Sequence, residues 1–139
     1  MATDYSRITY DASLVLKAAG GLTSSADGDI LDLGPGYVCG CLVIDLASAE
    51  VASGNEIYTI SLEGSTVAAM TSTSVCLAKK VFGNLVVPMD AALSTAGRYV
   101  IPFHNEENGT LYRYVRLSTL IAGTIDTTGI VFAAFIGKC

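Results

Sequence analysis

Apolar and polar residues alternate with a period of two along most of the chain, and the spacing typical of amphipathic helices is nearly absent. In residues 57–63, for example, Tyr58, Ile60 and Leu62 fall on one side, and the residues between them are polar. Successive side chains of a β-strand point to opposite faces of the sheet, so this alternation predicts strands with one buried face. Strands are predicted over residues 13–18, 30–33, 37–46, 57–63, 75–82, 85–89, 98–103, 111–120 and 129–136.

Turn-forming residues separate these runs, as in residues 34–36 and 126–129. The pair Asn108-Gly109 is a strong hairpin signal, because both residue types tolerate positive φ. Residues 47–53 and the segment following Asp90 are each compatible with a helical turn. About eight short strands with such turns predict an all-β fold, an antiparallel β-sandwich or jelly roll.

The chain has 139 residues, enough for one hydrophobic core and one domain. We expect an N-terminal arm over residues 1–10 and a single β-sandwich over residues 11–139. Hydrophobic residues make up 51% of the chain, and charged residues only 15%, whereas about 25% is typical of soluble domains. So lightly charged a surface predicts that neighbouring molecules cover part of it in the working state.

Charge and hydropathy argue against nucleic-acid binding, a membrane-spanning helix and a secretory signal. The net charge is −5, which argues against nucleic acid. The longest unbroken apolar run, residues 130–136, is far shorter than the roughly 18 residues of a membrane-spanning helix. The first residues are polar and acidic rather than basic and then apolar, so we expect synthesis in the cytoplasm without a secretory signal.

Charge is unevenly divided along the chain. Residues 1–70 hold two basic and nine acidic side chains, and residues 71–139 hold six basic and four acidic. The two halves of a β-sandwich interleave in space, so this division does not predict two oppositely charged faces. It is compatible with self-association.

Two cysteines stand one residue apart in an apolar run. On a strand, Cys39 and Cys41 share a face and lie about 6.5–7 Å apart, too far for a disulfide between them. A zinc site needs four ligands, and the remaining candidates, Cys76, His104 and Cys139, lack paired spacing. We therefore predict no metal site and interpret the pair as small buried or half-buried thiols of a protein kept in a reducing compartment.

Motifs for catalysis are missing from the sequence. It contains no nucleophile elbow, no phosphate-binding glycine loop and no paired metal-ligand motif. His104 is the only histidine, and the sequence places neither a nucleophile nor an orienting carboxylate beside it. We predict that the protein is not an enzyme and uses no cofactor.

The segment 111–117 carries a pattern typical of interfaces. Alternation puts Tyr112, Tyr114 and Arg116 on one face and aliphatic residues on the other. Tyrosine and arginine are enriched at binding hot spots. The alternative is that the tyrosines belong to the core with their hydroxyl groups at its rim, and the pattern alone does not decide between the two.

Five short segments follow one another in a recognisable order: DILDLG at residues 29–34, GRYVIPF at 97–103, RYVRL at 113–117, AGT at 122–124 and the final strand from Gly129. In this order they resemble the jelly-roll capsid cement, or decoration, proteins of tailed bacteriophages. Their order and spacing span most of the chain, although each is only a strand with its turn. Residues 1–7 and the cysteines depart from the family pattern.

This resemblance implies a structural protein of the virion, made in the host cytoplasm and located on the capsid exterior. Such proteins self-associate, here as a homodimer or homotrimer, and bridge neighbouring subunits of the major capsid protein. Terminal segments can order on a partner, so the first predicted contacts are Tyr5, Arg7 and Tyr10 of the arm; a frayed tail or first strand is the alternative there. The second are Tyr112, Tyr114 and Arg116.

A carbohydrate-binding jelly roll that recognises a host is the competing prediction. Sugar-binding platforms favour exposed tryptophan, and the chain has none, although it has seven tyrosines. Saturable binding on a glycan array would support this alternative.

Overall fold

A computed structural model describes residues 14–71, 74–84 and 93–139 of the protein. These residues form eleven β-strands and no α-helix, which confirms the all-β prediction, and so no helix among them could span a membrane. The strands are β1 (Val15–Leu22), β2 (Ala26–Asp27), β3 (Leu31–Asp32), β4 (Cys39–Ala49), β5 (Ile57–Ser65), β6 (Val75–Gly83), β7 (Gly97–His104), β8 (Glu106–Glu107), β9 (Thr110–Leu111), β10 (Tyr114–Ala122) and β11 (Ile130–Gly137).

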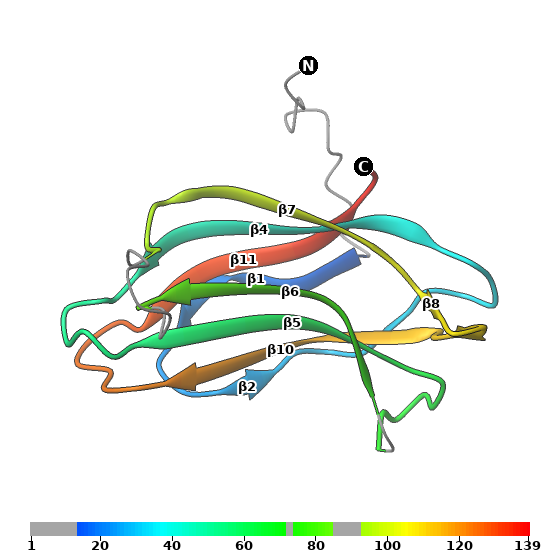
Figure 1. The fold of residues 1–139 in the computed structure, drawn as a ribbon, viewed down its shortest axis with the longest axis horizontal. Helices are drawn as coiled ribbons and strands as arrows, with labels where there is room; N and C mark the ends of the chain where they lie inside the picture. The colour runs from blue at the N-terminus through cyan, green and yellow to red at the C-terminus, as the bar shows by residue number, and fades with distance from the viewer. Residues whose placement is uncertain (1–13, 72–73, 85–92) are drawn as a thin grey trace.

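Two antiparallel sheets contain nearly all of these strands. The four-stranded sheet has the order β1-β11-β4-β7, and the five-stranded sheet has the order β2-β10-β5-β6, with β3 also pairing with β10. In Figure 1 the first set is labelled above the second, with the last strand, β11, lying between β1 and β4. Each sheet thus alternates early and late strands in the order of a jelly roll of eight main strands. The short β3 and the β8–β9 hairpin account for the larger total.

The hydrophobic core lies between the two sheets. Tyr58, Ile60 and Leu62 of β5 are fully buried, as the alternation in this run predicts. They belong to one cluster with residues of the opposite sheet, among them Ile44 of β4 and Phe132 of β11. Burial of these side chains supplies the main driving force for closing the sandwich.

The helical turn considered for residues 47–53 is wrong for residues 47–49, and only the end of this segment forms a turn, which the Gly54 amide closes with a hydrogen bond of 3.3 Å to the Val51 carbonyl. Strand β4 continues through Ala49, and Ala49 pairs with Ile130 of β11. The backbone pairing offered by the neighbouring strand outweighs the weak helix preference of a few alanine and serine residues. The predicted strand over residues 85–89 and the possible turn after Asp90 fall largely or wholly in residues 85–92, outside the described residues.

The hairpin predicted at Asn108-Gly109 is confirmed. Its central residues have φ values of 52° and 82°, and they connect β8 to β9. The amide of Gly109 also donates a hydrogen bond of 2.6 Å to the Glu106 side chain. Asparagine and glycine are the residues that adopt this conformation at least cost, so the sequence determines the turn locally.

The predicted strand over residues 111–120 is interrupted, and the cause is the buried side chain of Asn105. Its Oδ1 accepts a hydrogen bond from the Val38 amide at 2.7 Å, and its Nδ2 donates to the carbonyls of Gly36 at 3.0 Å and Tyr112 at 3.2 Å. The Tyr112 amide donates to the Asn105 carbonyl at 2.7 Å. These bonds hold Tyr112 out of the sheet, and β10 begins only at Tyr114.

At the opposite end of the sandwich, Glu50 fixes the loop before β11. The backbone amides of Asp126, Thr127 and Thr128 and the Thr127 hydroxyl donate hydrogen bonds of 2.6 to 3.1 Å to its carboxylate. These donors, led by the Asp126 amide, lower the pKa of Glu50 to about 2. The loop therefore depends on the charged form of this carboxylate.

Acid is expected to weaken this contact. The folded-state pKa of Glu50, about 2, lies below the ordinary value of 4.5, so its contribution to stability is complete above pH 4.5 and is lost as the pH falls toward 2. The melting temperature followed by circular dichroism should fall less steeply across that window in Glu50→Gln than in wild type. Glu107→Gln, at an exposed position, is the control. Parallel curves for wild type and Glu50→Gln would contradict the assignment.

Candidate functional site

The outer face of the five-stranded sheet carries charged side chains grouped around β10. Arg116 of β10 is the cross-strand partner of Glu63 on β5, and its Nε donates a hydrogen bond to Glu63 Oε2 at 3.0 Å. Its Nη2 lies 3.7 Å from Asp27 Oδ2 on β2. Strands on both sides of β10 therefore each contribute a carboxylate to one arginine.

A second arginine lies immediately before the same strand. Arg113 donates two hydrogen bonds to Asp32 of β3, at 2.7 and 2.9 Å, and its guanidinium carbon lies 5.5 Å from the centre of the Tyr114 ring. The Arg113 hydrogen bond, followed by one from the Gly34 amide, holds the pKa of Asp32 below its ordinary value. The β10 face, as we name it, comprises Asp27, Asp32, Glu63, Arg113, Tyr114 and Arg116.

The structure brings together two of the three residues predicted here from the sequence. Tyr114 and Arg116 are half-buried on the β10 face, and Val115 and Leu117 between and beyond them are buried in the core. Tyr114 thus presents its ring beside two ion pairs, in a position where a partner can contact it.

Tyr112 is not part of the β10 face, which corrects the prediction that it shares a side with Tyr114. A Cβ atom built on Gly64 would lie 3.0 Å from Tyr112 Cβ, and Gly64 continues the inward series of Leu62. Tyr112 therefore packs on the interior side of the sheet. The alternation is broken because residues 112–113 lie outside the strands, where Asn105 holds the backbone.

The remaining predicted contacts, Tyr5, Arg7 and Tyr10, lie outside the described residues. Sequence reasoning also missed four members of the β10 face, namely Asp27, Asp32, Glu63 and Arg113. The alternation in residues 57–63 does place Glu63 on the polar side of its strand. Its partner depends on the β5–β10 register, which the sequence does not give.

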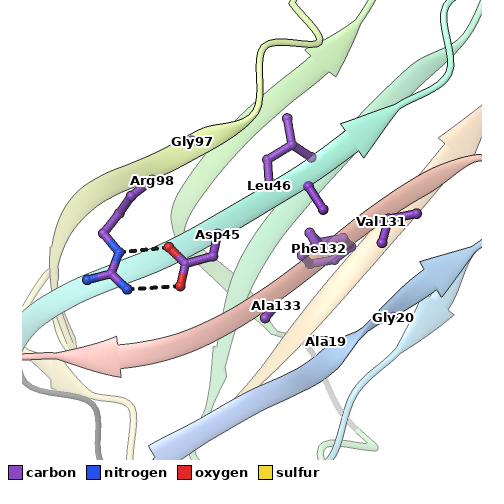
Figure 2. A pocket seen from close by; sticks show the side chains of 10 residues that line it. Ala19, Gly20, Asp45, Leu46, Gly97, Arg98, Val131, Phe132 and Ala133 are labelled. Atoms are coloured by element: carbon purple, nitrogen blue, oxygen red, sulfur yellow. Dashed lines mark hydrogen bonds and ion pairs between the residues drawn. The ribbon is translucent and has the colours of Figure 1, made fainter.

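The outer face of the four-stranded sheet has a different character. It contains a shallow hollow of about 570 Å³ formed by residues of β1, β4, β7 and β11, half of which are alanine or glycine, including Ala19, Gly20 and Ala133. Figure 2 shows these residues beside the paired side chains of Asp45 and Arg98. Arg98 donates two hydrogen bonds to Asp45, at 2.7 and 3.0 Å. This hollow therefore combines small and apolar side chains with one ion pair whose charges neutralise each other.

The arginine ion pairs cancel the uneven charge of the sequence. Arg98, Arg113 and Arg116 come from the second half of the chain, and each pairs with a carboxylate from the first half. Interleaving of early and late strands within each sheet brings these groups together. The uneven division of charge along the sequence is thus partly neutralised by contacts between the two halves of the chain.

One prediction about the cysteines is wrong. Cys41 is not a free thiol, because it forms a disulfide with Cys139, with Cα atoms 5.5 Å apart. Cys39 is an exposed free thiol rather than a buried or half-buried one, and Cys76 is also free and exposed. Among residues 14–71, 74–84 and 93–139, no group of three or more His, Cys, Asp or Glu side chains is arranged to hold a metal ion.

Comparison of the chain with models of protein families and with curated proteins gives no match.

Proposed function

We propose that the protein is a capsid cement, or decoration, protein of a tailed bacteriophage. It self-associates, as a homodimer or homotrimer, on the outer surface of the icosahedral head and links neighbouring subunits of the major capsid protein. It acts by binding and not by catalysis.

The observation that carries this proposal is the strand order. The family that the sequence resembles consists of small jelly-roll sandwiches, and the chain has the jelly-roll orders β1-β11-β4-β7 and β2-β10-β5-β6. A fold shared by many proteins does not define a function. It supports this one because the resembling segments 97–103, 113–117 and 129–135 fall on three of its strands, β7, β10 and β11.

The two outer faces also support a binding role. Charges on both faces are largely paired within the chain, so covering them leaves few isolated charges without water. The four-stranded face is lined by small residues that allow a partner surface to approach closely. Two or three such weak contacts per oligomer would add through effective concentration, so each interface can be modest.

The Cys41–Cys139 disulfide agrees with a location outside the cell. Disulfides persist on virion surfaces and in secreted proteins, whereas thiols stay reduced in the cytosol. A protein made in the host cytoplasm would acquire this bond during or after release of the virion.

The test is binding to purified heads. Heads of a phage that encodes this chain, prepared without it, are mixed with the protein and pelleted. We expect saturable occupancy on expanded heads, little on immature shells, and a higher temperature of head disruption when the protein is bound. Sedimentation of the free protein should give a dimer or a trimer. Absence of binding to expanded heads would overturn the proposal.

Removing residues 1–9 tests the arm. We expect occupancy on heads to fall, because this removes Tyr5 and Arg7, two residues of types that often anchor interfaces. A matched variant with Tyr5 and Arg7 both replaced by serine separates the loss of these side chains from the loss of chain length. Undiminished binding by the shortened protein would exclude the arm as a contact.

A further inference from the structure

Three cysteines gather at one end of the four-stranded sheet. Cys39 and Cys41 occupy alternate positions of β4, and the β4–β7 register runs without a shift from Cys39 onward, so their side chains share the outer face. Cys41 is bonded to Cys139 and is only 3% exposed. Cys39 is an exposed free thiol. A nucleophile thus lies two residues from a disulfide.

The register of β11 brings the third cysteine close to both. Gly137 pairs with Cys41 across the two antiparallel strands. Continuing this register by two residues would place Cys139 directly across from Cys39. The chain leaves the strand after Gly137, and Cys139 bonds diagonally to Cys41 instead. Both thiols of β4 are therefore within reach of the same terminal residue.

The segment that carries Cys139 lies outside the strand pairing. The β4–β11 ladder ends at the pair Gly137–Cys41, and residues 138–139 belong to no strand. Movement of Cys139 toward Cys39 would therefore break none of the pairing between β4 and β11.

We propose that Cys39 is a thiol–disulfide exchange site that acts on the Cys41–Cys139 bond. The Cys39 thiol gives its proton to solvent or to His104, its cross-strand partner on β7. The thiolate then attacks the Cys139 sulfur and forms the Cys39–Cys139 bond, while the Cys41–Cys139 bond breaks and its electron pair leaves on the Cys41 sulfur, which takes up a proton. No oxidant is consumed, because one disulfide replaces another.

The two bonded forms differ in which thiol faces solvent. The Cys41–Cys139 form exposes Cys39, a site for attack on other disulfides or for modification. The Cys39–Cys139 form moves the free thiol to Cys41, which is 3% exposed in the Cys41–Cys139 form. The exchange enlarges the closed loop by only two residues beyond the present separation of 98, so loop entropy favours neither form. The exchange would thus turn a reactive surface thiol on or off, independently of capsid binding.

Cys41→Ser tests the proposal directly. The oxidised variant is trapped with acid, alkylated and mapped by mass spectrometry. We expect a Cys39–Cys139 bond to form to the same extent as the Cys41–Cys139 bond in wild type. Cys39→Ser/Cys41→Ser is the matched control, because its only remaining partner for Cys139 is Cys76 on the other sheet, and it should form no intramolecular bond.

Free Cys39 and Cys139 in a folded, oxidised Cys41→Ser variant would overturn the proposal. If that variant does not fold, the wild-type protein carries the test. After incubation at mildly alkaline pH and acid trapping, the peptide map should contain the Cys39–Cys139 linkage besides the Cys41–Cys139 linkage. An added dithiol peptide mixed with a disulfide peptide serves as the positive control, because their complete exchange shows that the conditions permit the reaction. Absence of the Cys39–Cys139 linkage under those conditions would equally overturn the proposal.

Discussion

Tyr114→Ala is expected to bind expanded heads about thirty-fold more weakly than wild type, equivalent to a loss of about 2 kcal/mol. The ring of Tyr114 is half-buried on the β10 face beside Arg113, and its removal deletes the largest side chain that the face offers a partner. The fold should persist, because the core contacts of β10 come from Val115 and Leu117. Titration of head occupancy with labelled protein measures the change.

Two matched controls separate an interface from a general defect. Tyr37→Ala removes a tyrosine that is 61% exposed and lies beside His104, away from the β10 face, and it should leave occupancy unchanged. Arg116→Ala should weaken binding to heads. Its control is Arg98→Ala, which removes a comparable ion pair from the four-stranded sheet and should leave occupancy unchanged. Equal effects of Tyr114→Ala and Tyr37→Ala would exclude the β10 face as the contact. A defect in Arg98→Ala alone would assign binding to the four-stranded face.

The largest loss of stability is expected from Asn105→Ala. This change leaves the Val38 amide and the carbonyls of Gly36 and Tyr112 without their side-chain partner at a fully buried site. Unsatisfied buried groups cost about 1–3 kcal/mol each and part of this is relieved by water, so we expect a total loss of about 3–4 kcal/mol. Thermal unfolding should shift downward by roughly 10–15 °C.

Asn55→Ala is the matched control for Asn105→Ala. Asn55 also bonds through both ends of its amide, to the Thr124 amide at 3.0 Å and to the Thr124 hydroxyl at 3.3 Å, but it is exposed. Water replaces these partners, so the loss should stay within about 1 kcal/mol. Similar losses of unfolding free energy for Asn105→Ala and Asn55→Ala would show that the burial of Asn105 does not determine its contribution to stability.

Local features of the fold were predictable because their causes are local. The alternation in residues 57–63 needs only the pleat of one strand, and the burial of Tyr58, Ile60 and Leu62 follows from it. The Asn108-Gly109 turn needs only the backbone preferences of two residues. The prediction that Tyr112 shares a face with Tyr114 was wrong because the side chain of Asn105, seven residues earlier, donates a hydrogen bond to the Tyr112 carbonyl.

The candidate sites were less predictable, because they join residues far apart in the chain. Arg116 meets Glu63 at a separation of 53 residues, and Arg113 meets Asp32 at a separation of 81. The Cys41–Cys139 bond spans 98 residues. The sequence shows which residues are charged or contain sulfur, but only strand order and register decide which of them become neighbours.

The sequence by itself determined that this protein is built of β-strands, where its tight hairpin turn lies and which side of several strands is apolar. These properties depend on the period of the side chains and on backbone conformations that act over a few residues. The tertiary structure alone decided the sheet order, the pairing of the arginines and the fate of each cysteine. The physical reason is that closure of the sandwich brings together strands from opposite ends of the chain, and their register fixes every contact between them.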